Sequence, residues 1–88
     1  MVWTVEWSDT ARRDLRKLDK SLAERILNYM DQRVAAAGDP RALGKALRGP
    51  LGELWRYRVG DSRVLCELQD AKLIIIVVRV GNRKDIYR

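Results

Sequence analysis

Apolar and polar positions in residues 1–40 follow one strand-like and two helix-like patterns. Residues 2–7 alternate, with Trp3, Val5 and Trp7 on one side, and this period of two predicts a strand. Ser8 and Asp9 are common N-cap residues, so we expect them to end the strand and begin a helix. A second, longer helical pattern has an apolar residue at every fourth position. The members of that stripe are Leu22, Ile26, Met30 and Val34.

The ends of the second helix are indicated by capping and breaking residues. Ser21–Glu24 has the sequence of a capping box, which favours a helix start at this point. Gly38 suits the position just past a helix, and Pro40 cannot continue one. Residues 41–53 contain three glycines and one proline. We therefore expect a connector there, with a helical turn around residues 42–47.

The rest of the chain predicts three strands joined by tight turns. Residues 54–59 and 63–68 favour strands and are separated by the turn sequence Gly60-Asp61-Ser62. Residues 73–80 are apolar on both faces, which is typical of a central strand. The order β-α-α-β-β-β predicts an α+β fold. In it a helix hairpin packs on one face of a mainly antiparallel, twisted sheet.

Alternation along the predicted strands separates aromatic from basic side chains. Trp55 and Tyr57 fall on the face that would pack beneath the helices, and Arg56 and Arg58 fall on the open face. The tight turn then places Arg63 opposite Arg58 on that open face. Like charges in this position destabilise a sheet, so a phosphate held by the guanidinium groups explains the cluster better. The alternative is that some of these side chains extend past the strand edge into solvent.

Positive charge is concentrated in the second part of the chain. The formal net charge is +6, and residues 41–88 carry the whole excess because residues 1–40 are neutral overall. This asymmetry favours a nucleic-acid partner. An acidic protein partner and a basic surface without such a function are the alternatives. The further cations that we expect to contact RNA are Lys45, Arg48, Lys84 and Arg88.

The residue types restrict the chemistry. The chain has no histidine, a single cysteine and no metal-ligand motif, so we expect neither a metal nor another cofactor. RNA supplies its own nucleophile, the 2′-hydroxyl, and an enzyme has to align it, neutralise the phosphate and move protons. The lone thiol, the absence of an export signal and the short apolar runs predict a cytoplasmic protein without a membrane partner.

Two sequence blocks, LWRYRVGDSRV and VGNRKDIY, resemble the RelE family of bacterial toxin–antitoxin toxins, within the RelE/ParE superfamily. The resemblance covers nearly the whole chain in element order and implies a single toxin domain over residues 1–88. It implies a ribosome-dependent endoribonuclease that cleaves mRNA in the A site, by attack of the 2′-hydroxyl on the adjacent phosphate. It also implies an acidic, RelB-like antitoxin that neutralises the toxin in a hetero-oligomer.

The same resemblance assigns catalytic positions to five residues. Arg56 and Arg58 occupy the basic positions of the first block, and Arg63 follows its turn. Arg83 and Tyr87 are the arginine and the tyrosine of the second block. In the family these positions stabilise the phosphate, act as acid, and position or activate the 2′-hydroxyl. Without the resemblance, a tyrosine so close to a chain end would be expected to be frayed or held by packing.

Three positions depart from the family pattern. Arg56 stands where lysine is common, and because arginine cannot be deprotonated in a protein, general-base work would move to Tyr87 or solvent. Ser62 replaces a frequent aromatic residue, and Asn82 replaces a frequent histidine or lysine; both changes would alter activity or codon preference. Two other functions remain open. One is a ParE-like toxin that inhibits DNA gyrase without nuclease activity, and the other is a non-catalytic module that binds RNA or the antitoxin.

Overall fold

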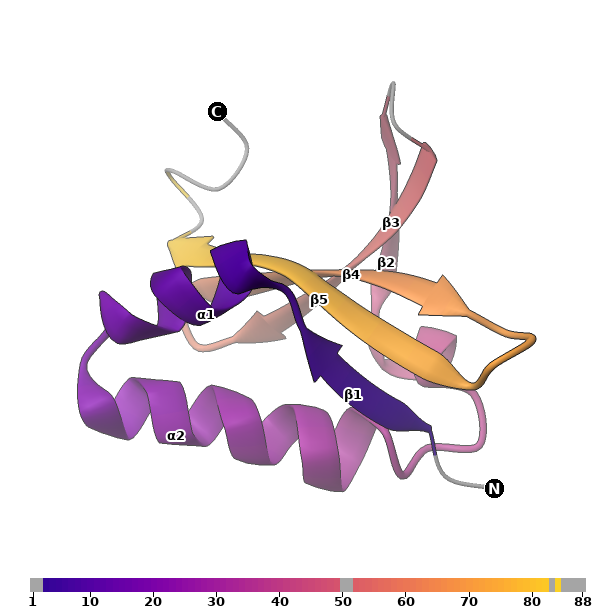
Figure 1. The fold of residues 1–88 in the computed structure, drawn as a ribbon, viewed down its shortest axis with the longest axis horizontal. Coiled ribbons are helices and arrows are strands. Elements are labelled where there is room, and N and C mark those ends of the chain that lie inside the picture. Colours follow the sequence, from indigo (N-terminus) through magenta and orange to yellow (C-terminus); the bar gives the residue numbers. More distant parts are fainter. Residues whose placement is uncertain (1–2, 50–51, 83, 85–88) are drawn as a thin grey trace.

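The computed structural model describes residues 3–49, 52–82 and 84, and these residues form one layer of helices against one sheet (Figure 1). Two α-helices follow the first strand and precede the other four strands. The elements are β1 (Thr4–Trp7), α1 (Asp9–Arg16), α2 (Lys20–Tyr29), a π-helical turn (Met30–Val34), a 3-10 turn (Pro40–Leu43), β2 (Lys45–Gly49), β3 (Gly52–Val59), β4 (Ser62–Gln69) and β5 (Ile74–Asn82). The predicted α+β architecture with a helix pair on one face is confirmed.

The sheet has five strands in the order β1-β5-β4-β3-β2. Strand β1 pairs with β5 in parallel, and the other three pairs are antiparallel. Strand β5 therefore lies inside the sheet, as its apolar composition predicted. The hairpin of β2 and β3 rises away from the helices in Figure 1.

Strand β2 was not predicted. The connector expected over residues 41–53 is instead a 3-10 turn followed by this strand, so the expected helical turn around residues 42–47 is wrong. The 3-10 turn begins earlier, because Pro40 fits a first helical position and the Asp39 carboxylate accepts a hydrogen bond from the Arg41 N–H at 3.0 Å. β2 is an edge strand ordered by its pairing with β3, from Lys45↔Arg56 to Gly49↔Gly52.

Both ends of α2 differ from the prediction. Its N-cap is Asp19, whose carboxylate accepts a hydrogen bond from the Ser21 hydroxyl at 2.7 Å. This bond holds the pKa of Asp19 below its usual value. The capping box expected at Ser21 is therefore not formed, because Ser21 lies inside the helix. After Tyr29 the chain continues into the π-helical turn, closed by a 2.8 Å bond from the Ala35 N–H to the Met30 carbonyl, so Gly38 lies beyond the helix end.

The core lies between the sheet and the helices. Ile26 and Met30 from the helical layer pack against Tyr57, Val64 and Val77 from the sheet, and all five are fully buried. Tyr57 therefore occupies the face predicted for it, while Arg58, one position along the strand, is exposed. Burial raises the pKa of both the Tyr57 phenol and the Cys66 thiol, which makes these groups poor proton donors at neutral pH.

Helix α1 continues the support that β1 gives to β5. β1 pairs with β5 as far as Trp7↔Val77, and Ser8 then donates its N–H to the Val77 carbonyl at 3.0 Å and its hydroxyl to the Val78 carbonyl at 3.2 Å. Ser8 is also the N-cap of α1 and accepts a 3.1 Å bond from the Ala11 N–H, as predicted for a capping serine.

One turn further along α1, Asp14 holds the following part of β5. The carboxylate is almost completely buried and accepts hydrogen bonds from the Val80 N–H at 2.9 Å and from Arg79 Nε at 3.0 Å. These contacts fix the position of the last part of β5, which ends at Asn82. Within the described part of the chain, no helix combines the length and the apolar character that a membrane span requires.

Candidate nucleic-acid interface

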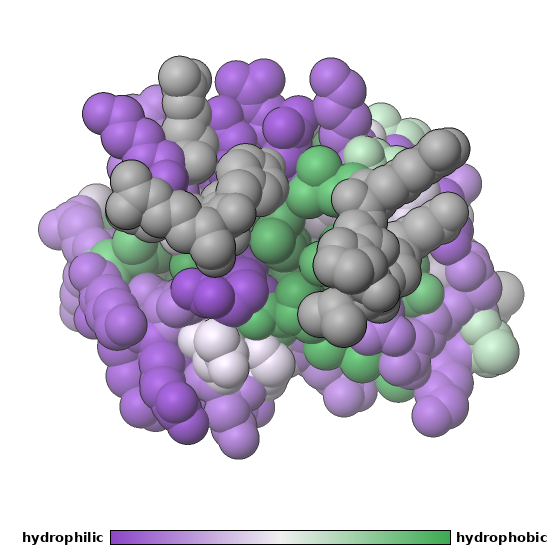
Figure 2. All heavy atoms as spheres, turned by 90° about the horizontal axis from the view of Figure 1, so that it is seen from above, coloured by the Kyte–Doolittle hydropathy of each residue, from purple (hydrophilic) through white to green (hydrophobic). Residues whose placement is uncertain are grey.

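The face of the sheet that is free of helices combines apolar and basic side chains. Residues of four strands fall on this face by register and alternation: Leu47, Leu54, Leu65 and Ile76. In the view of this face in Figure 2, hydrophobic side chains occupy the middle and hydrophilic ones surround them. The open face was expected to be a basic cleft. Among the described residues its centre is apolar, and Arg56 and Arg58 of β3 contribute basic side chains to it. Arg83 and Tyr87, the other predicted members of the cleft, lie outside the described residues, so the cleft remains a prediction.

The predicted pairing of Arg58 with Arg63 is confirmed. The two-residue turn Gly60-Asp61 joins β3 to β4, and the register runs through Arg56↔Leu65 and Arg58↔Arg63. Gly60 has a φ of 60°, a left-handed conformation that glycine adopts without strain. The turn therefore sets the register that brings the two arginines together.

Arg63 differs from the expectation in its burial. We expected an open guanidinium group, but Arg63 is 5% exposed and its Nη1 donates to the carbonyls of Ser62 at 3.1 Å and Gly60 at 3.4 Å. The side chain folds back on its own turn, where it satisfies backbone acceptors. Its contact with a phosphate remains a prediction, and the exposed cation of the pair is Arg58.

Arg56 and Arg58 line a pocket of about 360 Å³ at the edge of β3. We call it the β3-edge pocket; its lining residues are Tyr29, Leu43, Gly44, Lys45, Arg56 and Arg58. It lies where β2 begins, because Lys45 pairs with Arg56 and the preceding residues turn away from the strand. Three of the lining side chains are cationic and none is acidic. Such a site favours an anion, and phosphate suits arginine best because of its bidentate geometry.

Arg56 carries an unusual feature inside this pocket. Its Nε atom is buried and has no hydrogen-bond partner among the described residues. A buried donor without an acceptor lowers the stability of the folded protein by about 1–3 kcal/mol. A ligand oxygen that draws the guanidinium group into a new orientation would remove that cost.

Helix α2 contributes two residues to this edge that the sequence analysis missed. Tyr29 lines the pocket, and Arg25 lies one helical turn earlier on the same face. Arg25 Nη1 is 3.3 Å from the position that a Cβ atom on Gly60 would take, so it lies beside the turn that joins β3 to β4. The i, i+4 spacing of Arg25 and Tyr29 was visible in the sequence. Their approach to β3 was not, because it depends on how the helix packs.

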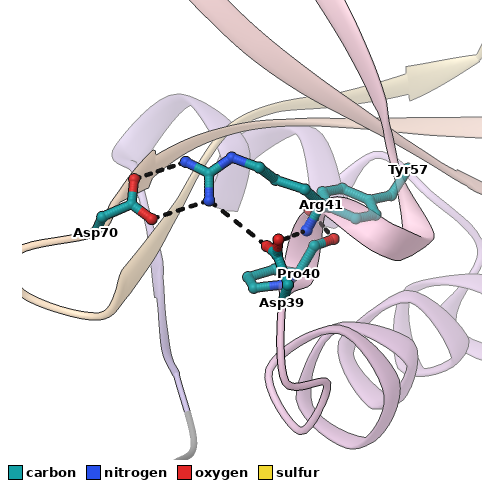
Figure 3. A network of polar contacts seen from close by, with 5 residues as sticks. All are labelled: Asp39, Pro40, Arg41, Tyr57 and Asp70. Atoms are coloured by element: carbon teal, nitrogen blue, oxygen red, sulfur yellow. Dashed lines mark hydrogen bonds and ion pairs between the residues drawn. The ribbon is translucent and has the colours of Figure 1, made fainter.

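The wall that carries Leu43 and Gly44 is fixed by contacts on both sides (Figure 3). The Tyr57 hydroxyl donates a 2.8 Å bond to the Pro40 carbonyl, which ties the 3-10 turn to β3. A Cβ atom on Gly44 would lie 2.8 Å from Tyr57 Cε1, so the missing side chain lets the backbone approach the ring. The pocket wall is thereby built before any ligand arrives.

Arg41 attaches the same turn to the loop between β4 and β5. It donates two hydrogen bonds to the Asp70 carboxylate, at 2.9 and 2.6 Å, in the bidentate arrangement drawn in Figure 3. These bonds raise the pKa of Arg41 and lower that of Asp70. The guanidinium carbon also lies 5.6 Å from the centre of the Trp55 ring. Arg41 is therefore a structural cation, in contrast to the cations of the pocket.

Other residues of the predicted site lie elsewhere or beyond the described part of the chain. Arg83, Tyr87 and Arg88 are outside the described residues, so their catalytic and RNA-binding roles remain predictions. Arg48 belongs to β2, and Lys84 is exposed just after β5, where its N–H donates to the Asn82 side chain at 3.0 Å. Lys45 is the predicted RNA-binding residue that the structure brings to Arg56 and Arg58.

The fold and its basic edge identify the class of protein. The sequence matches the family described as ParE toxin of type II toxin–antitoxin system, parDE, over residues 5–87. The chain belongs to this family and is a toxin of the RelE/ParE superfamily. The resemblance drawn from the two sequence blocks is confirmed at this level.

Its relatives include two named toxins of Mycobacterium tuberculosis. Toxin RelG is 35% identical over 92 residues, with 100% of this chain and 99% of that protein covered. Toxin RelE of the same organism is 30% identical over 79 residues, with 90% and 79% covered. Among solved structures, the toxin–antitoxin complex RelBE2 from M. tuberculosis contains a chain with a TM-score of 0.86 and 29% identity, covering 97% of this chain and 95% of that one.

Proposed function

We propose that this toxin is an endoribonuclease that cleaves mRNA in the ribosomal A site without a metal ion. The observation that carries the proposal is the β3-edge pocket, where Lys45, Arg56 and Arg58 converge with no acidic lining residue. The names of the relatives, RelG and RelE, support the nuclease branch of the superfamily.

The proposed reaction needs a nucleophile from the RNA and charge neutralisation from the protein. The 2′-hydroxyl oxygen forms a bond to the adjacent phosphorus, and the bond from phosphorus to the 5′-oxygen of the next nucleotide breaks. One proton leaves the 2′-hydroxyl and one is given to the departing 5′-oxygen. Arg58 is the exposed cation best placed to neutralise the phosphate, with Arg56 beside it.

Proton transfer falls to a group other than these arginines. Arginine stays charged throughout the accessible pH range, so neither Arg56 nor Arg58 can accept the 2′-hydroxyl proton. Buried Tyr57 is unsuited as well, because its pKa is raised and its hydroxyl is bonded to Pro40. We assign the proton transfer to Tyr87, with Arg83 stabilising the developing negative charge, as the family resemblance implies.

The proposed partners are the ribosome, mRNA and a cognate antitoxin. RelBE2 of M. tuberculosis is a toxin–antitoxin complex, and its toxin-like chain covers 97% of this chain. We propose that an acidic RelB-like antitoxin binds this toxin in a hetero-oligomer and blocks its basic edge. A basic toxin surface and an acidic partner would associate faster at low salt.

A ParE-like function is the second candidate, because the matched family is described as a ParE toxin family. Such a toxin would inhibit DNA gyrase and leave mRNA intact. The two functions are separated by incubating the purified toxin with a translating extract and with gyrase. Cleaved mRNA with unimpaired DNA supercoiling supports the nuclease, and the reverse result supports the gyrase inhibitor.

The decisive variants are Arg58→Ala, Arg83→Ala and Tyr87→Phe, tested for mRNA cleavage during translation. We expect each to lower the cleavage rate by about 10²-fold or more, the usual effect of removing one charge-stabilising or proton-transferring group. Lys72→Ala is the matched control, because Lys72 is an exposed cation in the turn between β4 and β5. Full cleavage by all three variants would refute the assignment of the site.

A further inference from the structure

The β3-edge pocket has an uncharged wall that charge neutralisation alone does not explain. Besides its cations, the pocket is lined by Tyr29, from the end of α2, and Leu43, from the 3-10 turn. Leu43 is 37% exposed and is the large apolar side chain that stands out to solvent among the described residues. A pocket that combines aromatic and apolar lining with a few charged groups is typical of a ligand site.

We propose that the β3-edge pocket is a subsite for one nucleotide, in which Tyr29 and Leu43 contact the base while Lys45 and Arg58 hold its phosphate. The inference rests on the proposed action on RNA and assigns to α2 a part in positioning it. An aromatic ring next to cations is the combination that single-stranded nucleic acid selects, because every base has a face that can stack. Tyr29 is thus a positioning residue rather than a catalytic one.

The dimensions of the pocket agree with one nucleotide. Its volume of about 360 Å³ lies near the lower end of the range for small-molecule sites, roughly 300–1,000 Å³. The wall is also held in advance, since Tyr57 binds the Pro40 carbonyl and Arg41 binds Asp70. A rigid wall lets a flat base stack without a further ordering cost.

The unpartnered Nε of Arg56 supports the presence of a ligand at this place. This donor belongs to a side chain that lines the pocket, and it finds no acceptor among the described residues. A nucleotide carries several oxygen acceptors, on its phosphate, sugar and base. Binding would allow the guanidinium group to turn and pair, and this gain is absent for a ligand without such acceptors.

The test is a titration of the purified full chain with the four nucleoside 5′-monophosphates and with ribose 5-phosphate, which lacks the base. Binding is followed by NMR through the Nε–H signals of Arg56 and Arg58 and the ring signals of Tyr29. The Arg56 Nε is buried in a side chain that lines the pocket, so its N–H signal is a suitable probe of binding. We expect at least one nucleotide to bind about tenfold more tightly than ribose 5-phosphate, the effect of one stacked base.

Two variants identify the source of that difference. Tyr29→Leu should remove the tenfold advantage and leave the affinity for ribose 5-phosphate unchanged. Tyr29→Phe keeps the ring and should keep the advantage, so it controls for a general loss of structure, which the backbone amide spectrum reports directly. Leu43→Ala should reduce the advantage about threefold, in proportion to its smaller contact.

Several results would overturn the inference. Equal affinity for ribose 5-phosphate and every nucleotide would make the pocket a phosphate site without a base contact. If Tyr29→Phe also loses the tenfold preference for a nucleotide over ribose 5-phosphate, the tyrosine acts through its hydroxyl and not through stacking. Perturbation by a glutamate-rich peptide, with no response to any nucleotide, would make the pocket a protein-binding site.

The outcome is separate from that of the proposed function. Binding of nucleotides in this pocket by a toxin that leaves mRNA intact in a translating extract would support the subsite and refute the nuclease function. Cleavage of mRNA at equal rates by wild type and Tyr29→Leu, together with no preference for a base in binding, would support the nuclease function and refute the subsite.

Discussion

Gly44 shows how the absence of one side chain shapes the site. Its backbone lies against the Tyr57 ring so closely that a Cβ atom would be 2.8 Å from Cε1 and 2.9 Å from Cζ. Tyr57 is fully buried and hydrogen bonded to Pro40, so the ring has little freedom to move away. The next residue is Lys45, a cation of the pocket, so this contact lies directly beside the site.

We predict that Gly44→Ala destabilises the protein by about 1–3 kcal/mol, the usual cost of forcing an extra group into a filled site. Denaturant-induced unfolding followed by circular dichroism measures the effect. Gly38→Ala is the matched control, because no atom lies within 4 Å of a Cβ placed there, and it should change stability by less than about 0.5 kcal/mol. Equal stability of the two variants would mean that the wall near Tyr57 is loose.

At the scale of single residues, alternation predicted the orientation of side chains well. It placed Tyr57 in the core and Arg58 outside, and the turn placed Arg58 opposite Arg63. It failed for the burial of Arg63, because a long side chain can fold back and satisfy carbonyls of its own turn. Tyr29 was missed because its role depends on the packing of α2 beside β3, which no local pattern records.

At the scale of elements, a buried carboxylate adds to the contacts that hold α1 against β5. Asp14 Oδ2 accepts hydrogen bonds from both the Val80 N–H and Arg79 Nε, and the residue is 8% exposed. Removing the carboxylate leaves a backbone N–H without its acceptor at a place where water has little access. The loss falls on the part of β5 that immediately precedes Arg83.

We predict that Asp14→Ala costs about 1–3 kcal/mol of stability, the usual effect of leaving a buried donor unpaired. Hydrogen exchange of the Val80 amide should accelerate more than that of amides in the centre of β4. Glu24→Ala on the exposed face of α2 is the control and should leave both measurements unchanged. Slow exchange at Val80 in Asp14→Ala would mean that the strand does not depend on α1.

The elements with a regular spacing of apolar residues were predicted. Strand β2, which depends on pairing with β3, was not. The two helices and three later strands follow apolar patterns that survive in the structure within a few residues. β2 has five residues with two glycines close by, and it becomes a strand because β3 offers its edge. The N-cap of α2 is Asp19 and not the expected Ser21, since both residues are able to cap and only the packed structure selects between them.

At the scale of the whole molecule, the charge distribution should control binding of RNA. The excess of positive charge lies in residues 41–88, and the structure collects part of it in one pocket. Arg41 is removed from this group because Asp70 neutralises it. The pocket therefore has fewer cations available to phosphate than the number of Lys and Arg residues in 41–88 indicates. The number of these cations determines the expected salt dependence of RNA binding.

We predict that the affinity for a short single-stranded RNA falls with salt, with a slope of log K against log salt near −2, about −0.7 for each of three phosphate contacts. Arg58→Ala should lower the magnitude of the slope by about 0.7. Lys72→Ala, which removes an exposed cation from a different turn, should leave the slope unchanged. Fluorescence anisotropy over a range of salt concentrations measures both, and a slope near zero would exclude an electrostatic site.

The parallel pairing of β1 with β5 has a consequence for how this chain folds. Thr4 pairs with Ile74, so this pairing joins two segments that lie far apart in the sequence. Contacts so distant in sequence form late and slow the folding of a small domain. Until residues 74–82 have paired, β1 therefore has no link to the rest of the sheet, because β5 is the strand that lies between them.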